Sequence, residues 1–494
     1  MRRTILLTAF FLLLTACKMG PDYTRPETPA GDAWRLAPAT SESIANLPWW
    51  ELFKDVELQK LIRTALDENL DLRVAAATVE QFQNQLFIAK FDFVPSLNYT
   101  GSAFTYHNTN NALGFGPANI PGPTGRSGGL SFSHASGVGG IKWEVDLWGR
   151  IRRNIEATRA QLLARAENQR GVIIGLVSNV AQSYFTMRAL DLQVEIAART
   201  LKVWDEAVKL TRIRFQQGYV SKLDLDRFEA EQAGTRAQLA NLERQVVQTE
   251  NQLSLTLGRK PMPIPRGLAL TEQPMPPDVP PGLPSALLRQ RPDILQAEQD
   301  LAAATAYIGV AEAQRFPQFS LNGIAGGAGF QLNSVSTGPF ATFGASGTLT
   351  GPLFNATALG FQVKVSEAET KQALAKYQNA ILTAFKEVED ALIAVQKTRE
   401  QREAQEAQVA ALQSALNFAD KRYRGGFASY LDVLTAQRDL FQAELGLAST
   451  RQQNLLSVVQ LYKALGGGWT PPVDQGSPAA ESQGARPEQP GPQR

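Results

Sequence analysis

The sequence predicts a mixed α and β membrane protein built from two structural repeats. The first half of the chain aligns with the second, so that Asp71 and Pro95 match Asp293 and Pro317 at a constant spacing of 222 residues. Two long stretches without proline, 124–260 and 353–470, favour very long helices. Short segments before these stretches alternate apolar with polar or charged residues, which is typical of strands with two different faces.

The repeat is long, and its two copies differ in length at one place. Leu147 matches Leu353 at a spacing of 206 residues, and Gly218 matches Gly426 at a spacing of 208. The fall from 222 to 206 indicates an excess of 16 residues in the first copy, between Pro95 and Leu147. A period near 210 residues is far longer than a solenoid repeat, so one large unit occurs twice.

The N-terminus reads as a secretory signal peptide, residues 1–16. Arg2 and Arg3 precede an apolar run over 5–14 that is too short to span a membrane as a mature helix. The run ends in Leu14-Thr15-Ala16-Cys17, which resembles the lipobox of bacterial lipoproteins. This resemblance implies that Cys17 becomes a lipidated N-terminus, and that Lys18 permits sorting to the outer membrane. The alternative is an ordinary signal peptide with an incidental cysteine.

Composition excludes several classes of site. Cys17 is the only cysteine, so a disulfide within one protomer and a thiolate metal site are excluded. Lys and Arg total 49 against 47 Asp and Glu, which gives no electrostatic case for binding nucleic acid. Apart from a covalent lipid on Cys17, no cofactor and no metal are expected.

The segment from Ile141 to Leu147 carries the strongest strand pattern. Its odd-numbered positions are apolar, whereas Lys142, Glu144 and Asp146 are charged. Weaker alternation occurs near residues 97–99, 319–321 and 347–353. Such strands fit an outer-membrane barrel, with a soluble sandwich as the alternative. Two hairpins give four strands per chain, fewer than the roughly eight of the smallest closed barrels, so several protomers must share one barrel.

Each repeat is expected to contain a helix, a β-hairpin, a long helix and a short helix. The first helices are expected over 56–90 and 285–314, the long helices over 150–217 and 356–424, and the short helices over 222–257 and 430–465. Apolar residues at steps of three and four, such as Val180, Tyr184 and Met187, indicate coiled-coil packing. At 1.5 Å per residue a long helix extends about 100 Å.

The predicted organisation has six parts. After the signal peptide come a lipidated N-terminal segment (17–55), repeat 1 (56–258), a proline-rich linker (259–284), repeat 2 (285–469) and a disordered tail (470–494). The tail is rich in Pro, Gly, Gln and Ser, a composition that does not form a core.

Several motifs together resemble the outer membrane factor family, the TolC-like lipoproteins that form the outer-membrane channel of RND-type tripartite efflux pumps. They are the lipobox at Cys17, Pro48-Trp49-Trp50, the paired Asp71/Pro95 and Asp293/Pro317, Asp146-Leu147-Trp148-Gly149-Arg150, and the segment from Arg422 to Asp432. The resemblance covers residues 17–469. It implies a homotrimer whose long coiled-coil helices form an α-barrel in the periplasm and whose strands form a shared 12-stranded transmembrane β-barrel.

The resemblance also implies the function. The channel conducts substrates passively to the outside, and receives them from an inner-membrane transporter through a periplasmic adaptor, the membrane fusion protein. Its location is the outer membrane, in contact with lipid, with the helical tunnel in the periplasm. Two alternatives stay open: an outlet for type I protein secretion, and a lipid-anchored coiled-coil scaffold in the periplasm without a pore.

The turns between long and short helices are the candidate functional site. Gly218 and Gly426 stand where each long helix must reverse, and glycine tolerates the left-handed conformation that ends helices. Ser221-x-x-Asp224 and Ser429-x-x-Asp432 match the capping box that begins a helix. The resemblance implies that these turns contact the adaptor. Two hypotheses remain for Asp224 and Asp432: they cap helices only, or they also ring the mouth of a periplasmic gate.

A basic cluster lies beside these turns. Arg212, Arg214, Arg422 and Arg424 occupy the last turns of the long helices, where cations interact favourably with the negative helix end. A second hypothesis gives Arg214, Arg422 and Arg424 ion pairs between protomers that latch the tip. Enzymatic function is not expected, because His107 and His134 lie in the strand and loop region without adjacent carboxylates.

Overall fold

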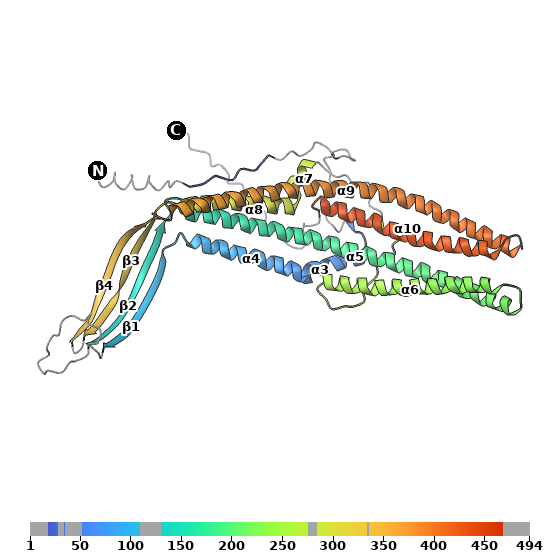
Figure 1. Cartoon of the computed structure of the whole chain (residues 1–494), viewed down its shortest axis with the longest axis horizontal. Coiled ribbons are helices and arrows are strands. Elements are labelled where there is room, and N and C mark those ends of the chain that lie inside the picture. The colour runs from blue at the N-terminus through green and yellow to red at the C-terminus, as the bar shows by residue number, and fades with distance from the viewer. Residues whose placement is uncertain are drawn as a thin grey trace, which may run out of the picture.

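The computed structural model describes residues 18–27, 34, 52–108, 130–274, 284–332 and 335–467. The predicted signal peptide, Cys17, the Pro48-Trp49-Trp50 motif and the predicted tail 470–494 lie outside the described residues. The molecule is elongated, with a β-sheet at one end and long helices that run away from it (Figure 1).

The sheet contains the two predicted hairpins side by side. Its strands are β1 (Ser96–Asn108), β2 (Leu130–Val145), β3 (Gln318–Leu332) and β4 (Val335–Thr350). All neighbours are antiparallel and the order is β1-β2-β3-β4. Because β2 pairs with β3, the two repeats join through their strands.

Each repeat contributes one long helix flanked by shorter ones. The long helices are α5 (Arg150–Gln216) and α9 (Ala356–Arg424). The short helices that return from the far end are α6 (Lys222–Thr256) and α10 (Tyr430–Ala464), and α4 (Leu70–Phe91) and α8 (Pro292–Ala313) lie nearer the sheet. Their bounds agree closely with the predicted ranges. Within the described residues no helix is long and apolar enough to cross a membrane.

The first helix of each repeat is broken, which the sequence analysis did not predict. The expected helix over 56–90 is α3 (Val56–Glu68) and α4, separated at Asn69, and the helix over 285–314 is α7 (Pro284–Gln290) and α8, separated at Arg291. Asn69 is extended and its side chain accepts a hydrogen bond from the Leu72 N–H at 2.9 Å, so it caps a new helix. Arg291 is extended because Pro292 disfavours helical backbone at the preceding residue.

The two breaks have the same role in both repeats. The Asn69 side-chain amide donates to the Thr256 carbonyl at 2.8 Å, and the Arg291 guanidinium donates to the Ala464 carbonyl at 2.9 Å. Both acceptors are in the last turn of a short helix, where carbonyls lack partners within the helix. The break therefore receives the end of α6 or α10, and the short helices stack end to end along the long one.

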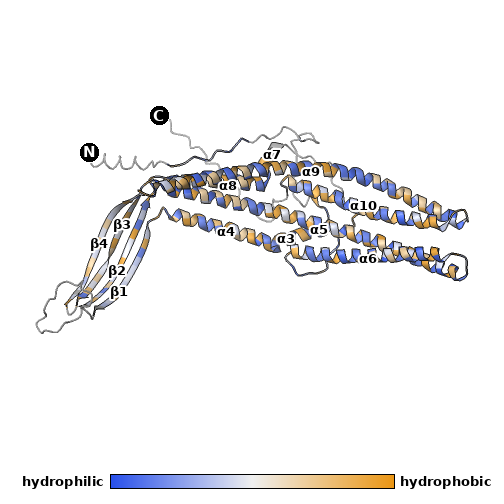
Figure 2. Ribbon diagram, in the orientation of Figure 1, coloured by the Kyte–Doolittle hydropathy of each residue, from blue (hydrophilic) through white to orange (hydrophobic). Residues whose placement is uncertain are grey.

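The main hydrophobic core lies at this junction, in the middle of the helical part. It contains residues from α3, α5, α6, α8, α9, α10 and the linker, among them Leu58, Tyr184, Leu253, Ile294, Ile381 and Tyr462. Alternating colours along the helices in Figure 2 show that apolar residues also occur along their whole length. Smaller clusters continue toward the far end, so the core is longest along α5.

Asp55 joins three parts of the chain inside this core. Its carboxylate is 1% exposed and accepts hydrogen bonds from the Tyr184 hydroxyl (2.7 Å), the Gln273 amide (2.8 Å) and the Leu268 N–H (2.9 Å). Burial alone raises the pKa of Asp55, but the hydrogen bonds from Gln273, Tyr184 and the backbone outweigh it and hold the pKa below its usual value. The ionised carboxylate therefore fixes the N-terminal segment and the linker to α5.

Replacing Asp55 by Asn is expected to destabilise the protein at pH 7 by about 2 kcal/mol, because the buried donors lose a charged acceptor. A lowered pKa stabilises the fold above the usual carboxyl pKa, and this contribution is lost as the pH falls through the folded pKa. The thermal midpoint of Asp55→Asn, measured by circular dichroism, should lie roughly 2 °C below wild type at pH 7. The difference should shrink below about pH 4.

The exposed Asp226, which pairs with Lys222 on the surface of α6, provides the control. Asp226→Asn should change the midpoint little at either pH. If Asp55→Asn and wild type have the same thermal midpoint at pH 7, the Asp55 carboxylate does not stabilise the fold.

Candidate functional site

The two turns predicted as the candidate site lie together at the end of the molecule opposite the sheet. The α5–α6 turn and the α9–α10 turn both reach this end in Figure 1. We call the two turns and the helix ends beside them the tip. The structure thus brings the predicted glycines, serines, aspartates and arginines of both turns to one end of the molecule.

Both long helices end in the same backbone motif. Gly218 and Gly426 have φ values of 78° and 76°, the left-handed conformation that glycine was predicted to supply. The Tyr219 N–H donates to the Arg214 carbonyl and the Phe427 N–H to the Arg422 carbonyl, each at 2.8 Å. These bonds, with those of the two glycine N–H groups, form Schellman motifs that satisfy the last carbonyls of α5 and α9.

The first short helix begins with the predicted capping box. The Ser221 hydroxyl accepts a hydrogen bond from the Asp224 N–H at 3.2 Å, and the Asp224 carboxylate accepts one from the Ser221 N–H at 3.3 Å. The Ser221 hydroxyl also donates to the same carboxylate at 2.7 Å. Asp224 is therefore held against its own turn.

The capping box predicted at Ser429 and Asp432 does not form. The Ser429 hydroxyl accepts from the Leu431 N–H at 3.0 Å, and the Asp432 N–H donates to the Ser429 carbonyl instead. In a capping box the Asp432 N–H would donate to the Ser429 hydroxyl, but here it donates to the Ser429 carbonyl. The Asp432 side chain therefore does not fold back onto the turn. Within the described residues its exposed carboxylate has no hydrogen bond or ion pair. Asp224 and Asp432 occupy matched positions of the two repeats, but only the Asp224 carboxylate is hydrogen-bonded to its turn.

The arginines of the tip have partners inside the same protomer. Arg214 donates to the Tyr423 hydroxyl, which connects the C-terminal end of α5 to that of α9. Arg422 donates to the Phe427 carbonyl at 3.3 Å and so supports its own turn. Arg424 pairs with Asp420 at 2.8 Å on α9, and Arg212 pairs with Glu229 on α6 at 2.7 Å.

Aromatic side chains connect the two helical hairpins near the tip. Tyr423 lies 4.4 Å from Tyr430, Tyr430 lies 4.7 Å from Phe228, and Phe228 lies 6.1 Å from Trp204, measured between ring centroids. The row therefore passes from the second repeat to the first, through the contact of Tyr430 with Phe228. With Arg214 against the Tyr423 ring, it is the main contact between the hairpins at this end. Burial raises the pKa of Tyr430, so the phenol stays neutral.

A cavity of about 380 Å³ lies between the hairpins beside this row. Arg214, Asp224, Arg227, Tyr423 and Tyr430 are among the residues that line it. Sequence reasoning identified Arg214 and Asp224, and missed Arg227 and both tyrosines. The symmetric placement of the tyrosines around the turn, in Tyr423-Arg424-Gly425-Gly426-Phe427-Ala428-Ser429-Tyr430, was the available signal. No cluster of three potential metal ligands occurs among the described residues.

At the opposite end of the helices, the motif from Asp146 to Arg150 turns strand β2 into helix α5. The Asp146 carboxylate accepts from the N–H groups of Ile151 and Arg152, at 3.2 and 3.1 Å, and so caps α5. Trp148 donates to the Pro317 carbonyl at 2.7 Å, which joins the two repeats where both enter the sheet. The motif is thus structural.

The segment after the predicted lipid site is fixed at this junction. Arg153 is 1% exposed and donates to the carbonyls of Met19 and Gly20, at 2.7 and 2.6 Å. Lys18 pairs with Glu156 at 2.9 Å. Cys17 itself lies outside the described residues, but its neighbour Lys18 is held beside the first turns of α5, close to the sheet.

Comparisons with known proteins agree with this architecture. The family model of outer membrane efflux proteins matches residues 61–259 and 283–467. The probable efflux pump outer membrane protein TtgC of Pseudomonas putida is 36% identical over 473 residues, which cover 94% of this chain and 95% of TtgC. The probable outer membrane lipoprotein SilC of Salmonella typhimurium is 32% identical, covering 94% of this chain and 98% of SilC. The outer-membrane channel OprN has a similar structure, with a TM-score of 0.80, 28% identity, and coverage of 92% of this chain and 100% of the OprN chain.

These likenesses confirm the predicted fold class, the outer-membrane location and the function as an efflux outlet. They favour efflux over the type I outlet and the scaffold, because the named relatives are efflux proteins and a channel. The matched regions include both repeats, and the chain therefore belongs to the outer membrane efflux protein family.

Proposed function

We propose that three copies of this chain form one conduit, with a shared 12-stranded barrel and a helical tunnel. The sheet edges carry this proposal: within the described residues, no strand pairs with the outer edge of β1 or of β4. In lipid, such edges leave backbone amides and carbonyls without hydrogen-bond partners. Pairing β4 of one protomer with β1 of the next satisfies both edges, and three chains close the barrel.

The exposed apolar faces of the helices support the same assembly. Large apolar side chains on α4 and α9 are half or more exposed in the single protomer: Leu70, Val74, Ile88, Phe91, Phe361 and Leu382. Patches of this kind mark protein contacts. In a ring of protomers, α4 and α9 are the outermost helices of neighbouring chains, so these side chains become buried.

The conduit receives its cargo passively and without catalysis. We infer that a periplasmic adaptor engages the tip and connects it to an inner-membrane transporter. Tyr219 and Phe427, 77% and 79% exposed, follow Gly218 and Gly426 at matched positions of the two turns. These exposed aromatic side chains, with the hydroxyls of Ser221 and Ser429 beside them, are of the kind that protein partners bury.

The tip is also the proposed gate. Three copies of Asp432, each with a carboxylate that no described group neutralises, place a ring of negative charge at the periplasmic mouth. Opening requires the hairpins to separate, so the contacts of Arg214 and Tyr423 hold the closed state within one protomer. Asp224 is tied into its capping box and contributes mainly to the helix start.

Purified mature protein is expected to be a trimer, because two free edges per chain need two neighbours. Light scattering in detergent, corrected for bound detergent, should give a protein mass of three chains. A monomer that still shows heat-modifiable migration on a gel, the sign of a closed barrel, would contradict the shared barrel.

Replacing Asp432 by Asn should lower cation selectivity with little change in stability. The carboxylate makes no cap, and ring charges at a narrow mouth act over short range with little screening. Single-channel conductance and reversal potential in planar bilayers, at low and high salt, measure the effect. Asp224→Asn is the matched control at the equivalent position: it keeps an oxygen acceptor for the Ser221 N–H, should cost at most about 0.3–1 kcal/mol through the lost charge at the helix N-terminus, and should leave selectivity unchanged. Equal selectivity in wild type and Asp432→Asn at both salts would exclude the charge ring.

Replacing Cys17 by Ser should abolish lipidation while the helices and strands still fold. The thiol is the proposed attachment point, and Lys18 to Gly20 are held by Glu156 and Arg153 without it. Metabolic labelling with palmitate measures the modification, and wild type serves as the positive control. Label that persists in Cys17→Ser would exclude this residue as the lipid site.

A further inference from the structure

One face of the sheet changes its chemistry halfway along the strands. Ser102 pairs with Ser136, Ser136 with Ala328 and Ala328 with Phe340. Even-numbered residues of the four strands therefore share one face, up to a register shift between Ala328 and Phe330. We call it the even face, and the other the odd face.

Near the helices the even face is polar. It carries Ser96, Asn98, Lys142, Glu144, Ser320, Asn322, Ser346 and Thr348. The Asn322 amide donates to the Thr348 hydroxyl at 3.2 Å across two strands. The odd face at the same height is apolar, with Leu97, Tyr99, Ile141, Trp143, Phe319, Leu321 and Leu349. Since lipid excludes charged side chains, the odd face contacts lipid and the even face lines the lumen.

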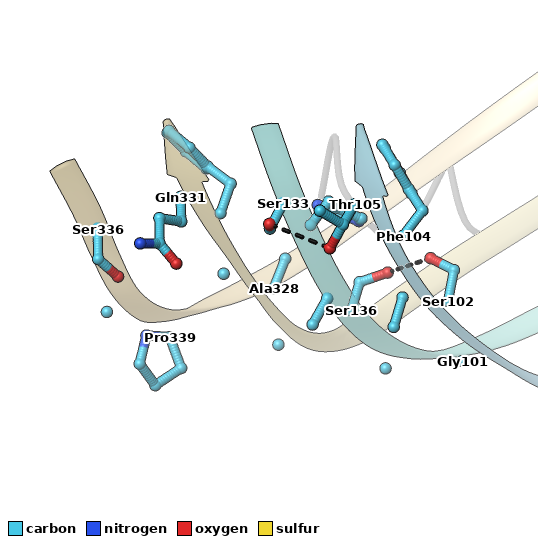
Figure 3. Close-up of a pocket in the computed structure, with 18 residues that line it drawn as sticks. Gly101, Ser102, Phe104, Thr105, Ser133, Ser136, Ala328, Gln331, Ser336 and Pro339 are labelled. Atoms are coloured by element: carbon cyan, nitrogen blue, oxygen red, sulfur yellow. Dashed lines mark hydrogen bonds between the residues drawn. The ribbon is translucent and has the colours of Figure 1, made fainter. Parts of the chain in front are cut away.

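Toward the far end of the strands the pattern inverts. The even face becomes aromatic, with Phe104, Tyr106, Phe132, His134, Phe330 and Phe340. The odd face becomes polar, and the hydroxyls of Thr105 and Ser133 are hydrogen-bonded at 3.1 Å (Figure 3). Strands β1 and β2 pair in continuous register throughout, so the same face still points inward. A polar odd face does not suit lipid, so this part of the barrel extends beyond the membrane.

The aromatic side chains form a continuous band across all four strands. Ring centroids lie 5.3 Å apart for Phe104 and His134, 5.7 Å for Phe104 and Phe132, 6.3 Å for Phe132 and Phe330, and 6.4 Å for Phe330 and Phe340. A hollow of about 1150 Å³ lies along this part of the sheet, lined in part by Phe104, His134 and Phe330 (Figure 3). We call the band from Phe104 to Phe340 the aromatic collar.

The collar is not explained by packing within the chain. Phe104 and Phe340 are 52% and 47% exposed, although a water-filled lumen favours polar side chains. A lipid-facing aromatic girdle is excluded by position, because the same face carries Lys142 and Glu144 lower down. Aromatic rings with open faces bind planar apolar groups by stacking and bind cations through the ring face.

We propose that the aromatic collar is a binding site for planar aromatic cargo at the outer mouth of the lumen. The inference rests on the proposed barrel of three chains, in which three collars face one another. Cargo that leaves the polar lower lumen meets an apolar ring before it reaches the outside. The collar holds aromatic molecules, neutral or cationic, and disfavours small hydrated ions, because apolar constrictions lose water.

The test compares two blockers of equal charge that differ by one ring. Benzyltrimethylammonium and tetramethylammonium are added at the extracellular side of the channel in planar bilayers, and the ionic current is recorded. Wild type should be blocked by the benzyl compound at about a tenfold lower concentration. Phe132→Leu and Phe340→Leu keep apolar bulk but remove the ring, so each should abolish most of this preference.

Phe343→Leu is the matched control, because Phe343 lies on the odd face of β4 and is 85% exposed. It should keep the tenfold preference. Phe132→Tyr, which retains a ring, should keep it too. A conducting wild type without ring preference, or equal loss in Phe343→Leu, overturns the collar and leaves the efflux channel intact. A wild type that inserts but carries no current contradicts the proposed channel, and the collar with it.

Discussion

The unpaired edges of the four-stranded sheet are the constraint on which the rest of the molecule depends. A sheet of this width does not close on itself, and lipid supplies no hydrogen bonds to its outer strands. Strands of neighbouring chains must complete the sheet into a closed barrel. The ends of all strands therefore lie on a ring. Helices α5 and α9 begin five and six residues after β2 and β4 end. Because these connections are short, the helices are arranged in the same ring and form a tunnel.

Two equivalent hydrogen bonds, one in each repeat, join the short helices that form the wall of this tunnel. Asn69 and Arg291 have different side chains, yet each breaks a helix and donates to the last turn of the returning short helix, at Thr256 and Ala464. Close backbone contact reinforces the joint, because a side chain at Gly258 would lie 2.5 Å from the Glu68 carbonyl. The two repeats therefore make the same joint with different side chains. The wall of half-length helices stays continuous as a result.

The fold was largely predictable from sequence, because its signals are local. Proline positions and the spacing of Gly218 and Gly426 determined the helix ends, and alternation near Ile141 determined the strands. The breaks at Asn69 and Arg291 were missed although Pro292 and the cap by Asn69 are local signals, because the helix ends that the breaks receive lie far along the chain. At the tip, Asp224 and Asp432 have the same local motif but different bonds. The aromatic row through Tyr423 and Tyr430 joins segments about 200 residues apart, which no window of sequence reveals.

The two hairpins of the tip differ in how firmly they are held. Buried positions of α5 continue to Thr211, near its end, whereas the buried positions of α9 in the single protomer stop at Ala391, although the helix runs to Arg424. The last third of α9 is therefore attached mainly through α10 and the aromatic row. Burial determines which element moves at low cost. In the proposed gate, we therefore expect the α9–α10 hairpin, which carries the unpaired Asp432, to move more easily than the α5–α6 hairpin.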